Sequence, residues 1–428
     1  MYDWANSAYV TTVSVAVLPI LFADFIVGKS GFKIFGTVYD SETLWGFMMS
    51  FSAMWMFWLA PVLGAISDFS RSKKRFLMVF CYLGSLSALL LSLCGPGDVW
   101  PTILLFVLAQ IGFVGGNVFY DAFLPHITTD KTIDRVSGKG FAYGYIGGGL
   151  QFALSLAIIA GHDFIGISEP TAARIAIATA ALWWAGFAVV TFLTLRETGP
   201  TEELPESYRR LPKILAYLKL GIVRTVLTAL KVRRFKHLLL FLIAFMIYDD
   251  GIQTVIFMAT IYGKSELGLP SGVLLITLLI IQFVAFFGSL LFSRLAEKFS
   301  AKRALMITLI MWSCVVVYAY FMTTAGEYLV LGVIVGLSMG GSQALSRSLY
   351  GSMIPPDASA EFYGFYSIFG KFSAIWGPAV FAIINHVSGS ARISIISLIV
   401  FFVLGLVLLT FVDVEKARAA KKSPLFNG

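Results

Sequence analysis

Apolar runs long enough to cross a membrane recur along the whole of this chain. A helical run of roughly 18 or more apolar residues spans the ~30 Å of hydrocarbon in a bilayer. The 428 residues are 58% hydrophobic and only 13% charged, whereas a soluble domain carries about 25% charged residues. Transmembrane β-strands would appear instead as ~10-residue alternating segments, and the sequence has no such pattern. We therefore predict an all-α polytopic membrane protein.

We place twelve membrane spans, numbered 1 to 12 in chain order. Their approximate ranges are 2–27, 44–67, 76–95, 102–124, 140–161, 172–195, 237–262, 272–294, 304–323, 328–350, 362–386 and 392–413. Span 1 does not resemble a cleaved signal peptide, because it lacks a basic leading region and carries Asp3 and Asn6.

The distribution of Lys and Arg predicts the orientation of these spans. If the N-terminus is cytoplasmic, the cytoplasmic connections and tail hold 26 Lys and Arg residues and the outer connections hold five. Lys371, the remaining one, lies inside span 11. Cytoplasmic loops of membrane proteins are enriched in basic residues, so both termini are expected in the cytoplasm.

The same distribution accounts for the net charge of +8, so nucleic acid is not an expected partner. The three cysteines and four histidines are scattered, which gives no metal-ligand spacing. The sequence contains neither a nucleotide-binding loop nor a nucleophile–base set. We expect no cofactor, no metal and no enzymatic activity, and an ion or solute gradient as the energy source.

Stretches of the second half of the chain repeat the first half in the same order. "ARIAIATAALWWAGFAVVTFL" from Ala173 resembles "ARISIISLIVFFVLGLVLLTFV" from Ala391. "YDWANSAY" from Tyr2 resembles "YDDGIQTV" from Tyr248. Two parallel repeats of six spans are a transporter signature.

A third pair of stretches extends the repeat into the cytoplasmic loops. "GAISDFSRSKKR" from Gly64 resembles "SRLAEKFSAKR" from Ser293, and this alignment matches Asp68 with Glu297. A Gly-Gly pair at 115–116 likewise matches one at 340–341. We divide the chain accordingly into a six-helix bundle at 1–195, a cytoplasmic linker at 196–236, a second six-helix bundle at 237–413 and a cytoplasmic tail at 414–428.

The linker contains an amphipathic pattern. Apolar residues recur at helical spacing, and Lys213, Lys219, Arg224 and Lys231 occupy other faces. This pattern is typical of a helix on the inner membrane surface. A plain tether between the two bundles is the alternative.

Two adjacent carboxylates, Asp249 and Asp250, lie in the middle of span 7. An ionised carboxylate facing lipid at that depth costs ~2.5–3.5 kcal/mol or more. Each is therefore expected to face a cavity, find a cationic partner or remain protonated, and a carboxyl that exchanges its proton suits proton coupling. Lys371 in span 11 could pair with either carboxylate or bind a substrate carboxylate, and Gly251 could loosen span 7 locally. A fixed structural ion pair is the alternative.

Polar side chains in three further spans complete the candidate site. Asp3 and Asn6 are the span-1 counterparts of the span-7 acids, and they lie deep if span 1 begins before this chain does. If the chain is complete, Asp3 lies at the cytoplasmic mouth instead. Asn117 in span 4 and Gln343 in span 10 can orient a zwitterion by hydrogen bonds. With Asp249, Asp250 and Lys371, they form the predicted substrate or proton-coupling site.

Asp121 lies one helical turn after Asn117 in span 4, and Arg347 lies one turn after Gln343 in span 10. Both are near the cytoplasmic ends of their spans. We interpret them as an inner gate pair, with substrate contact as the alternative.

The loop "GAISDFSRSKKR", with its weaker copy at 293–303 and the six-plus-six spans, resembles the major facilitator superfamily. It departs from that superfamily's loop motif in having Phe69 after the acid and no glycine before the basic run. The resemblance implies that Asp68 caps the first turn of span 11, that Gly64 permits close packing, and that such contacts stabilise the outward-facing state. We assign gate roles to Gly64, Asp68, Arg71, Arg75, Asp121, Arg347, Glu297 and Arg303.

Three motifs resemble one branch of that superfamily, the vacuole-effluxer-like family of autophagy-related amino-acid effluxers. They are "YDWANSAY", "GGSQALSRSLYGSMIP" from Gly340 and "EFYGFYSIFGKFSAIWGP" from Glu361. Members of that family usually carry a longer stretch before the first motif, so we expect this chain to begin inside span 1. The resemblance implies a secondary transporter, and the fungal members imply amino acids leaving a compartment.

The leading hypothesis is a monomeric secondary transporter of a small solute, amino acids first, by rocker-switch alternating access, with proton coupling and export as open possibilities. A transporter of a sugar, peptide or drug is one alternative, and a non-transporting membrane sensor on the same fold is another. The short loops favour a bacterial inner membrane over a fungal vacuole.

Overall fold

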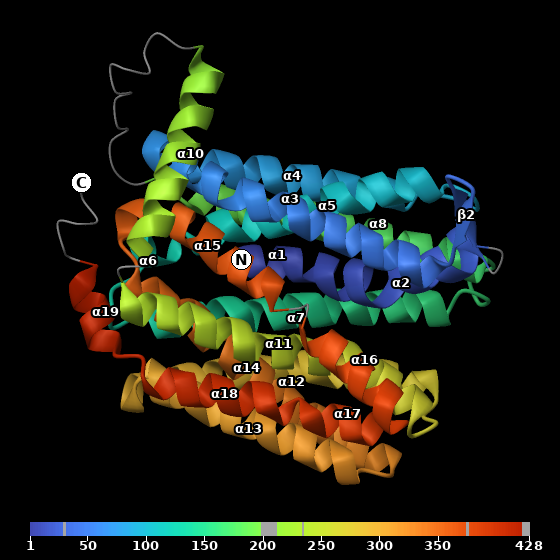
Figure 1. The fold of residues 1–428 in the computed structure, drawn as a ribbon. Helices are drawn as coiled ribbons and strands as arrows, with labels where there is room; N and C mark the ends of the chain where they lie inside the picture. The colour runs from blue at the N-terminus through green and yellow to red at the C-terminus, as the bar shows by residue number, and fades with distance from the viewer. Residues whose placement is uncertain (29–30, 198–211, 233–234, 374–375, 422–428) are drawn as a thin grey trace. The chain divides into compact units, whose positions relative to one another are not determined.

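The computed structural model describes residues 1–28, 31–197, 212–232, 235–373 and 376–421 (Figure 1). Within these residues, twelve segments are helical, long and apolar enough to cross a membrane. Each overlaps one predicted span, which confirms the polytopic helical fold. Contacts between residues group the described chain into two compact units.

Unit 1 holds residues 1–59, 72–120 and 143–197. Its elements are α1 (Tyr2–Ala8), η1 (Tyr9–Val17), α2 (Leu18–Leu21), η2 (Phe22–Val27), β1 (Phe32–Ile34), β2 (Thr37–Tyr39), most of α3 (Ser41–Ser70), α4 (Lys73–Leu91), α5 (Val99–Asp121), most of α7 (Ile133–Ala160) and α8 (Glu169–Thr194).

Unit 2 holds residues 60–71 and 121–142 together with the described residues after 211. Besides the end of α3 and the start of α7, its elements are α6 (Leu124–Ile127), α10 (Lys213–Val232), α11 (Lys236–Ser265), α12 (Ser271–Phe299), α13 (Ala301–Phe321), α14 (Ala325–Met353), η3 (Pro356–Ala358), α15 (Ser359–Phe372), α16 (Trp376–Ser388), α17 (Ala391–Ser397), α18 (Ile399–Thr410) and α19 (Val414–Ala420). Two short segments of the predicted first bundle thus make their contacts with helices of the second.

Two features of unit 1 depart from regular α-helix. Span 1 runs without interruption from Tyr2 to Val27, but η1 and η2 within it are π-helical, a rare geometry that often occurs at functional sites. A short antiparallel hairpin, β1–β2, follows span 1 and was not predicted by the sequence analysis. Its turn residues Phe35 and Gly36 have φ of 47° and 90°, the positive values that a tight two-residue hairpin turn requires.

Close packing in unit 2 depends on glycine where α12 meets α14. A Cβ atom at Gly340 would lie 2.2 Å from the carbonyl oxygen of Ala285, so any larger residue would push these two helices apart. In membranes, where lipid tails compete for apolar surface, such close backbone approach is a main source of helix association.

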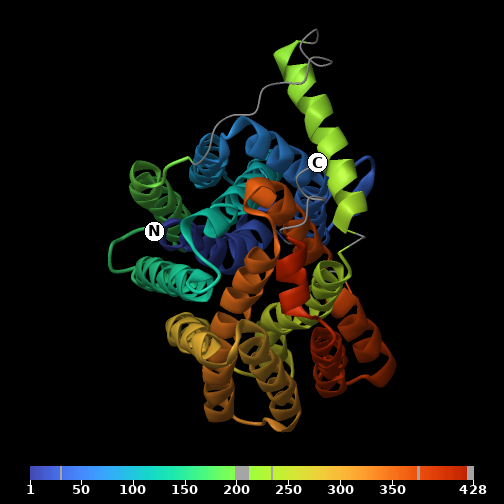
Figure 2. The ribbon, with the colours of Figure 1, turned by 90° about the vertical axis from the view of Figure 1, so that its left-hand side faces the viewer.

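The helix α10 has a different direction from its neighbours in unit 2. Figures 1 and 2 show it running across the direction of α11 and α12, at the end of unit 2 where α6 and α19 also lie. We refer to this end of the helices as the α10 end.

Candidate functional site

The two span-7 carboxylates lie in the middle of α11 and are buried. Asp249 and Asp250 are the fourteenth and fifteenth of its thirty residues, about 20 Å along the helix axis. Their exposed fractions are 7% and 2%. α11 continues unbroken through Gly251, so the helix does not loosen at that glycine.

Both carboxylates contact the neighbouring span 11 close to where its helix α15 ends. α15 ends at Phe372, Ser373 after it is a turn residue, and the next described helix, α16, starts at Trp376. We refer to this end of α15 as the interruption of span 11 (Figure 1). Asp249 Oδ2 accepts a hydrogen bond from the Ser373 hydroxyl at 2.7 Å. Asp250 Oδ1 accepts one from the backbone N–H of Gly377 at 2.8 Å. First-turn N–H groups have no partner within their own helix, and a negative charge there is favoured by the helix dipole.

Lys371 lies at the end of α15 and is half-buried. Among the described residues, it forms no ion pair within 4.0 Å with either carboxylate. The fixed structural pair considered from the sequence is therefore not formed in this conformation.

A cavity of about 370 Å³ borders Asp250. It lies within unit 2 between α11, α16 and the α17–α18 pair. Its other lining residues are Met246, Ile247, Trp376, Val380, Ile384, Ser397, Val400, Phe401 and Leu404. The walls are therefore almost entirely apolar around one buried carboxylate, which suits an uncharged organic group better than a metal ion.

The span-1 residues pair with span 4 inside unit 1. The Tyr120 hydroxyl donates to Asp3 Oδ2 at 3.0 Å, and the Asn6 amide donates to Asn117 Oδ1 at 2.5 Å. Asp3 also lies beside Gly144 of α7. Gln343, in unit 2, is half-buried on α14.

Asp68, a predicted gate residue, lies at the end of α3 and contacts the first turn of α15. Its two carboxylate oxygens accept the backbone N–H groups of Ala360 at 3.2 Å and Glu361 at 2.8 Å. Gly64 allows this approach, since a Cβ there would lie 2.5 Å from the Ala360 carbonyl oxygen. This is the contact that the superfamily resemblance implied for Asp68.

The repeat counterpart of Asp68 makes a related contact at the start of α7. Glu297, at the end of α12, accepts two hydrogen bonds from the Arg135 guanidinium, at 2.6 and 3.1 Å. One turn earlier, Ser293 lies against Gly138. Arg303, predicted beside Glu297 in the gate, is exposed, and its backbone N–H bonds to Ser300.

Asp121 and Arg347 form an ion pair of 3.0 Å at the same end. Arg347 is buried, with 5% of its surface exposed. Its guanidinium also donates to the hydroxyl and carbonyl oxygens of Ser137 and stacks on Phe141 at 4.1 Å. A buried guanidinium with all these partners is a strongly held part of the α10 end.

The other two predicted gate residues differ from each other. Arg71 pairs with Asp357 at 3.2 Å and has a positive φ of 49°, which orders the turn after α3. Arg75 is exposed on α4 in unit 1.

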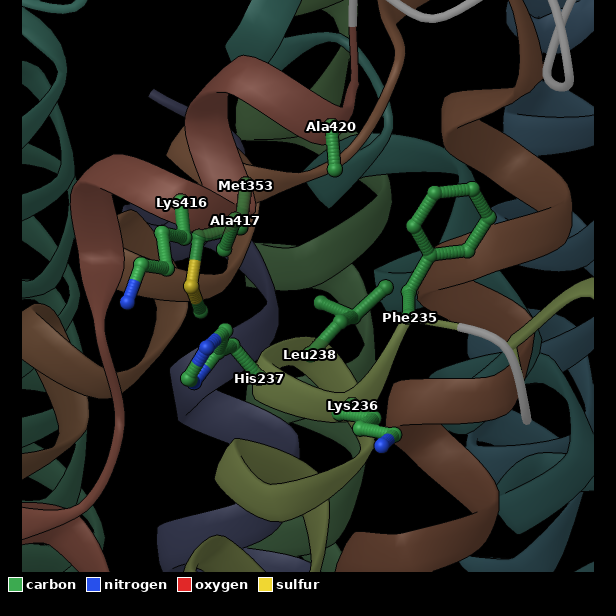
Figure 3. A pocket seen from close by; sticks show the side chains of 8 residues that line it. All are labelled: Phe235, Lys236, His237, Leu238, Met353, Lys416, Ala417 and Ala420. Carbon is green, nitrogen blue, oxygen red and sulfur yellow. The ribbon is translucent and has the colours of Figure 1, made fainter.

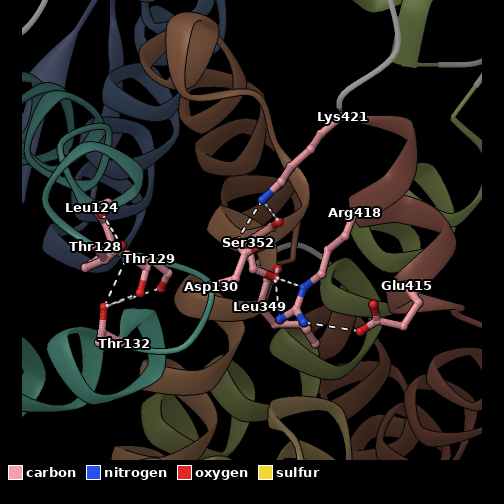
Figure 4. Close-up of polar contacts among 10 residues, drawn as sticks. All are labelled: Leu124, Thr128, Thr129, Asp130, Thr132, Leu349, Ser352, Glu415, Arg418 and Lys421. Atoms are coloured by element: carbon pink, nitrogen blue, oxygen red, sulfur yellow. Dashed lines mark hydrogen bonds and ion pairs between the residues drawn. The ribbon is translucent and has the colours of Figure 1, made fainter.

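The C-terminal helix α19 adds contacts that the sequence analysis did not predict (Figure 4). Arg418 donates to the Ser352 hydroxyl at 3.3 Å. Lys421 donates to the Ser352 carbonyl oxygen at 2.9 Å and to Asp130 at 2.8 Å. The tail thereby joins the end of α14 to the connection that precedes α7.

A second cavity, of about 230 Å³, lies where α19 meets the start of α11 and the end of α14 (Figure 3). In Figure 3 the ammonium group of Lys236 points away from Leu238 in its wall. Lys416 is paired with Asp413 at 3.2 Å. We interpret this cavity as a seam between helices rather than a substrate site.

Several partners of the candidate residues were not found from the sequence. Ser373 and Gly377 donate hydrogen bonds to the span-7 acids. Arg135 donates to Glu297, and Ser137 accepts a hydrogen bond from Arg347. One sequence signal for the interruption of span 11 is Pro378, because a proline inside an apolar helical pattern ends or kinks the helix. The other partners are backbone groups or common polar residues without a pattern of their own.

Comparison with solved structures shows which fold the chain has. The chain resembles the major facilitator superfamily transporter FucP in the outward conformation, with a TM-score of 0.70 over 96% of this chain and 97% of that one, at 9% identity. It also resembles the proton:xylose symporter XylE, with a TM-score of 0.67 over 98% and 96% of the two chains, at 13% identity. The fold is therefore that of a major facilitator superfamily transporter.

Sequence comparison then gives the family within that class. Residues 1–422 match the family described as "Vacuole effluxer Atg22 like", and the chain belongs to it. The "Uncharacterized MFS-type transporter YxiO" of Bacillus subtilis (strain 168) is 37% identical over 97% of this chain and 94% of that protein. "Autophagy-related protein 22-1" of Aspergillus niger is 29% identical over 67% of this chain, and the match covers only about half of that protein (48%). The chain is thus an integral, multi-pass membrane protein of the transporter class.

Proposed function

We propose that this chain is a secondary active transporter of small zwitterionic solutes, with amino acids as the first candidates. The observation that carries the proposal is the buried Asp249–Asp250 pair, held against the interruption of span 11 in a chain with a transporter fold. Buried ionisable groups in membrane spans mark substrate or ion pathways, and transporter binding sites are commonly built around broken helices.

The charges at this interruption suit a zwitterion. Among the described residues, Lys371 and Asp249 form no ion pair within 4.0 Å with each other, so each group keeps capacity for a partner of opposite charge. We assign the substrate ammonium to Asp249 and the substrate carboxylate to Lys371. The apolar cavity beside Asp250 then offers about 370 Å³ for an uncharged side chain.

The hydrogen-bond donors distinguish the roles of the two acids. Gly377 presents a backbone N–H to Asp250, and a backbone N–H can only donate, which favours an ionised acceptor. Asp249 meets the Ser373 hydroxyl, which can donate to a carboxylate or accept from a protonated carboxyl. We therefore assign proton exchange to Asp249 and a mainly structural role to Asp250.

The contacts at the α10 end fit the gate of an alternating-access cycle. Asp68, Glu297 and the Asp121–Arg347 pair each join a segment of the first six spans to helices of the last six. If that end opens during the cycle, these contacts break together. We assign the α10 end to the cytoplasmic side, which the 26 to 5 distribution of Lys and Arg supports.

The relatives support a proposal for the membrane and for the direction of transport. The extensive match to a Bacillus subtilis protein supports a bacterial plasma membrane, with a fungal vacuolar membrane as the alternative. The family description names effluxers, which supports export from the compartment where the solute accumulates.

The test is counterflow of a labelled amino-acid mixture into proteoliposomes, with and without an inside-alkaline pH gradient. The proposal expects accumulation in both conditions and more of it with the gradient. Liposomes containing the Asp249→Asn variant are the matched control. A folded wild-type protein that accumulates no amino acid in either condition would overturn the amino-acid assignment.

A further inference from the structure

The helix α10 exposes a broad apolar face. Seven of its large apolar side chains are each between 38% and 54% exposed. They are Leu215, Leu218, Ile222, Val223, Val226, Leu227 and Leu230. Four of them, at 215, 218, 222 and 226, follow the three- and four-residue spacing that lines one side of a helix. A face this large and apolar, left in water, would be unusual for a protein surface.

The opposite side of α10 packs on the end of α3. The Tyr217 and Phe69 rings lie 6.1 Å apart, and the Arg224 guanidinium lies 4.8 Å above the Phe69 ring. Gly221 lies against Ile66, and Ala216 and Leu220 are buried. The helix is therefore seated on unit 2 by one side, and the apolar face points away from that seat.

The exposed face of α10 does not belong to a membrane span. α10 is not among the twelve segments of the described chain that are long and apolar enough to cross a bilayer. It also runs across the direction of α11 and α12 rather than along it (Figures 1 and 2). This direction fits a helix that lies along a membrane surface rather than one that crosses the bilayer.

Two observations identify what this face contacts. α10 ends at Val232, and the membrane span α11 begins at Lys236, so the end of α10 is held at the bilayer surface. The sequence from 213 to 236 contains seven Lys and Arg residues and no Asp or Glu. Amphipathic helices with an apolar face and basic flanks bind anionic lipid surfaces, and clusters of Lys and Arg beside a membrane span attract anionic headgroups.

We infer that α10 is a docking surface for the anionic lipid leaflet around the protein, with its apolar face buried among acyl chains and the positive charge of this basic segment attracting lipid phosphates. This surface is distinct from the transport site, and its occupant is the bilayer rather than a second protein. Because α10 is seated on the segment of α3 that ends in Asp68, the docked helix also restrains one side of the α10-end gate.

The experiment measures lipid contact directly in the full-length protein. Ile222→Cys is made with Cys314→Ser, because Cys314 is exposed whereas Cys81 and Cys94 are buried. The cysteine is labelled with a small environment-sensitive fluorophore, and the protein is reconstituted with brominated phosphatidylcholine or brominated phosphatidylglycerol at equal mole fraction. We expect both brominated lipids to quench the fluorescence of this label, with phosphatidylglycerol quenching it about twofold more than phosphatidylcholine. The difference between the two lipids should shrink at high salt.

Two matched labels calibrate this measurement. A label on native Cys314, exposed on the membrane span α13, should be quenched by both lipids. A label on Glu415→Cys in the Cys314→Ser protein should be quenched by neither, because the Glu415 side chain is 83% exposed on α19. An Ile222 label quenched no more than the Glu415 label would overturn the docking surface. Equal quenching by the two lipids at low salt would overturn its preference for anionic headgroups.

Discussion

Asp250 Oδ1 accepts the backbone N–H of Gly377 at 2.8 Å, so a carboxylate of span 7 completes the first turn of the second half of span 11. The adjacent Asp249 bonds Ser373 on the other side of the interruption. Two neighbouring acids in an apolar helix are thus used to hold a break in another helix, where unpaired backbone groups would be costly in the membrane. This arrangement makes the two acids unequal and gives each a separate test.

Asp250→Ala should loosen the start of α16. Removing a carboxylate or hydroxyl that caps a helix costs about 0.5–2 kcal/mol, which corresponds to roughly 2- to 30-fold faster amide exchange in the first turn. Asp250→Asn keeps an oxygen acceptor and should exchange less than the alanine variant. The measurement is hydrogen exchange of peptides covering 376–388, and equal exchange in the wild type and both variants would contradict the capping role.

Asp249→Asn should abolish gradient-driven accumulation while leaving solute exchange. The amide cannot take up or release a proton, but it can still accept a hydrogen bond from Ser373. Both activities are measured in the same proteoliposomes, by counterflow and by uptake under a pH gradient. Gln253→Ala removes the weaker 3.4 Å partner of Asp249 and is the control that should retain coupling. Retention of both activities by folded Asp249→Asn would remove this residue from the coupling role.

The membrane spans, the two span-7 acids and the Asp68 contact could be predicted from the sequence because their physical causes are local. Apolar length alone predicts the spans, and the cost of a carboxylate in hydrocarbon singles out Asp249 and Asp250 before any partner is known. The Asp68 contact follows from a loop motif with a known geometry. In each case one segment carries the whole signal.

The interruption of span 11 and the partners of the site residues depend on how two segments pack together, so they could not be predicted from one segment of sequence. An irregularity was expected at Gly251 in span 7, whereas the interruption lies in span 11, where Gly377 and Pro378 weaken the helix and Asp250 satisfies the freed N–H. The sequence also gave no reason for Glu297 to select Arg135, because a surface arginine has no distinctive spacing. Whether Lys371 pairs with an acid is likewise decided by distances that only the folded chain sets.

Asp68→Asn should shift the conformational balance toward an open α10 end without changing which solute binds. The variant weakens the hydrogen bonds from Ala360 and Glu361 by roughly 1–2 kcal/mol, since a neutral amide oxygen replaces a carboxylate. Alkylation of Ser348→Cys, buried at this end, should become about 5- to 30-fold faster in a Cys314→Ser background. Glu297→Gln, which weakens the related contact with Arg135, should act in the same direction. An altered solute preference or an unchanged alkylation rate would contradict the gate role of Asp68.

Arg347→Ala should destabilise the protein far more than Arg135→Ala, although both remove an arginine from an ion pair at the α10 end. Arg347 is 5% exposed, and its loss removes a buried ion pair with Asp121 and a hydrogen bond to the Ser137 carbonyl. Breaking a buried pair by removing one partner costs about 3–5 kcal/mol. The Arg135 side chain is 57% exposed, and an exposed pair contributes about 0–1 kcal/mol. Unfolding in mixed micelles measures the difference. Arg347→Ala combined with Asp121→Ala should recover part of the loss, because the second change removes the carboxylate that had paired with Arg347. Equal losses for the two single variants would show that the Asp121–Arg347 pair is hydrated and weak, and would leave the gate dependent on the Asp68 contact.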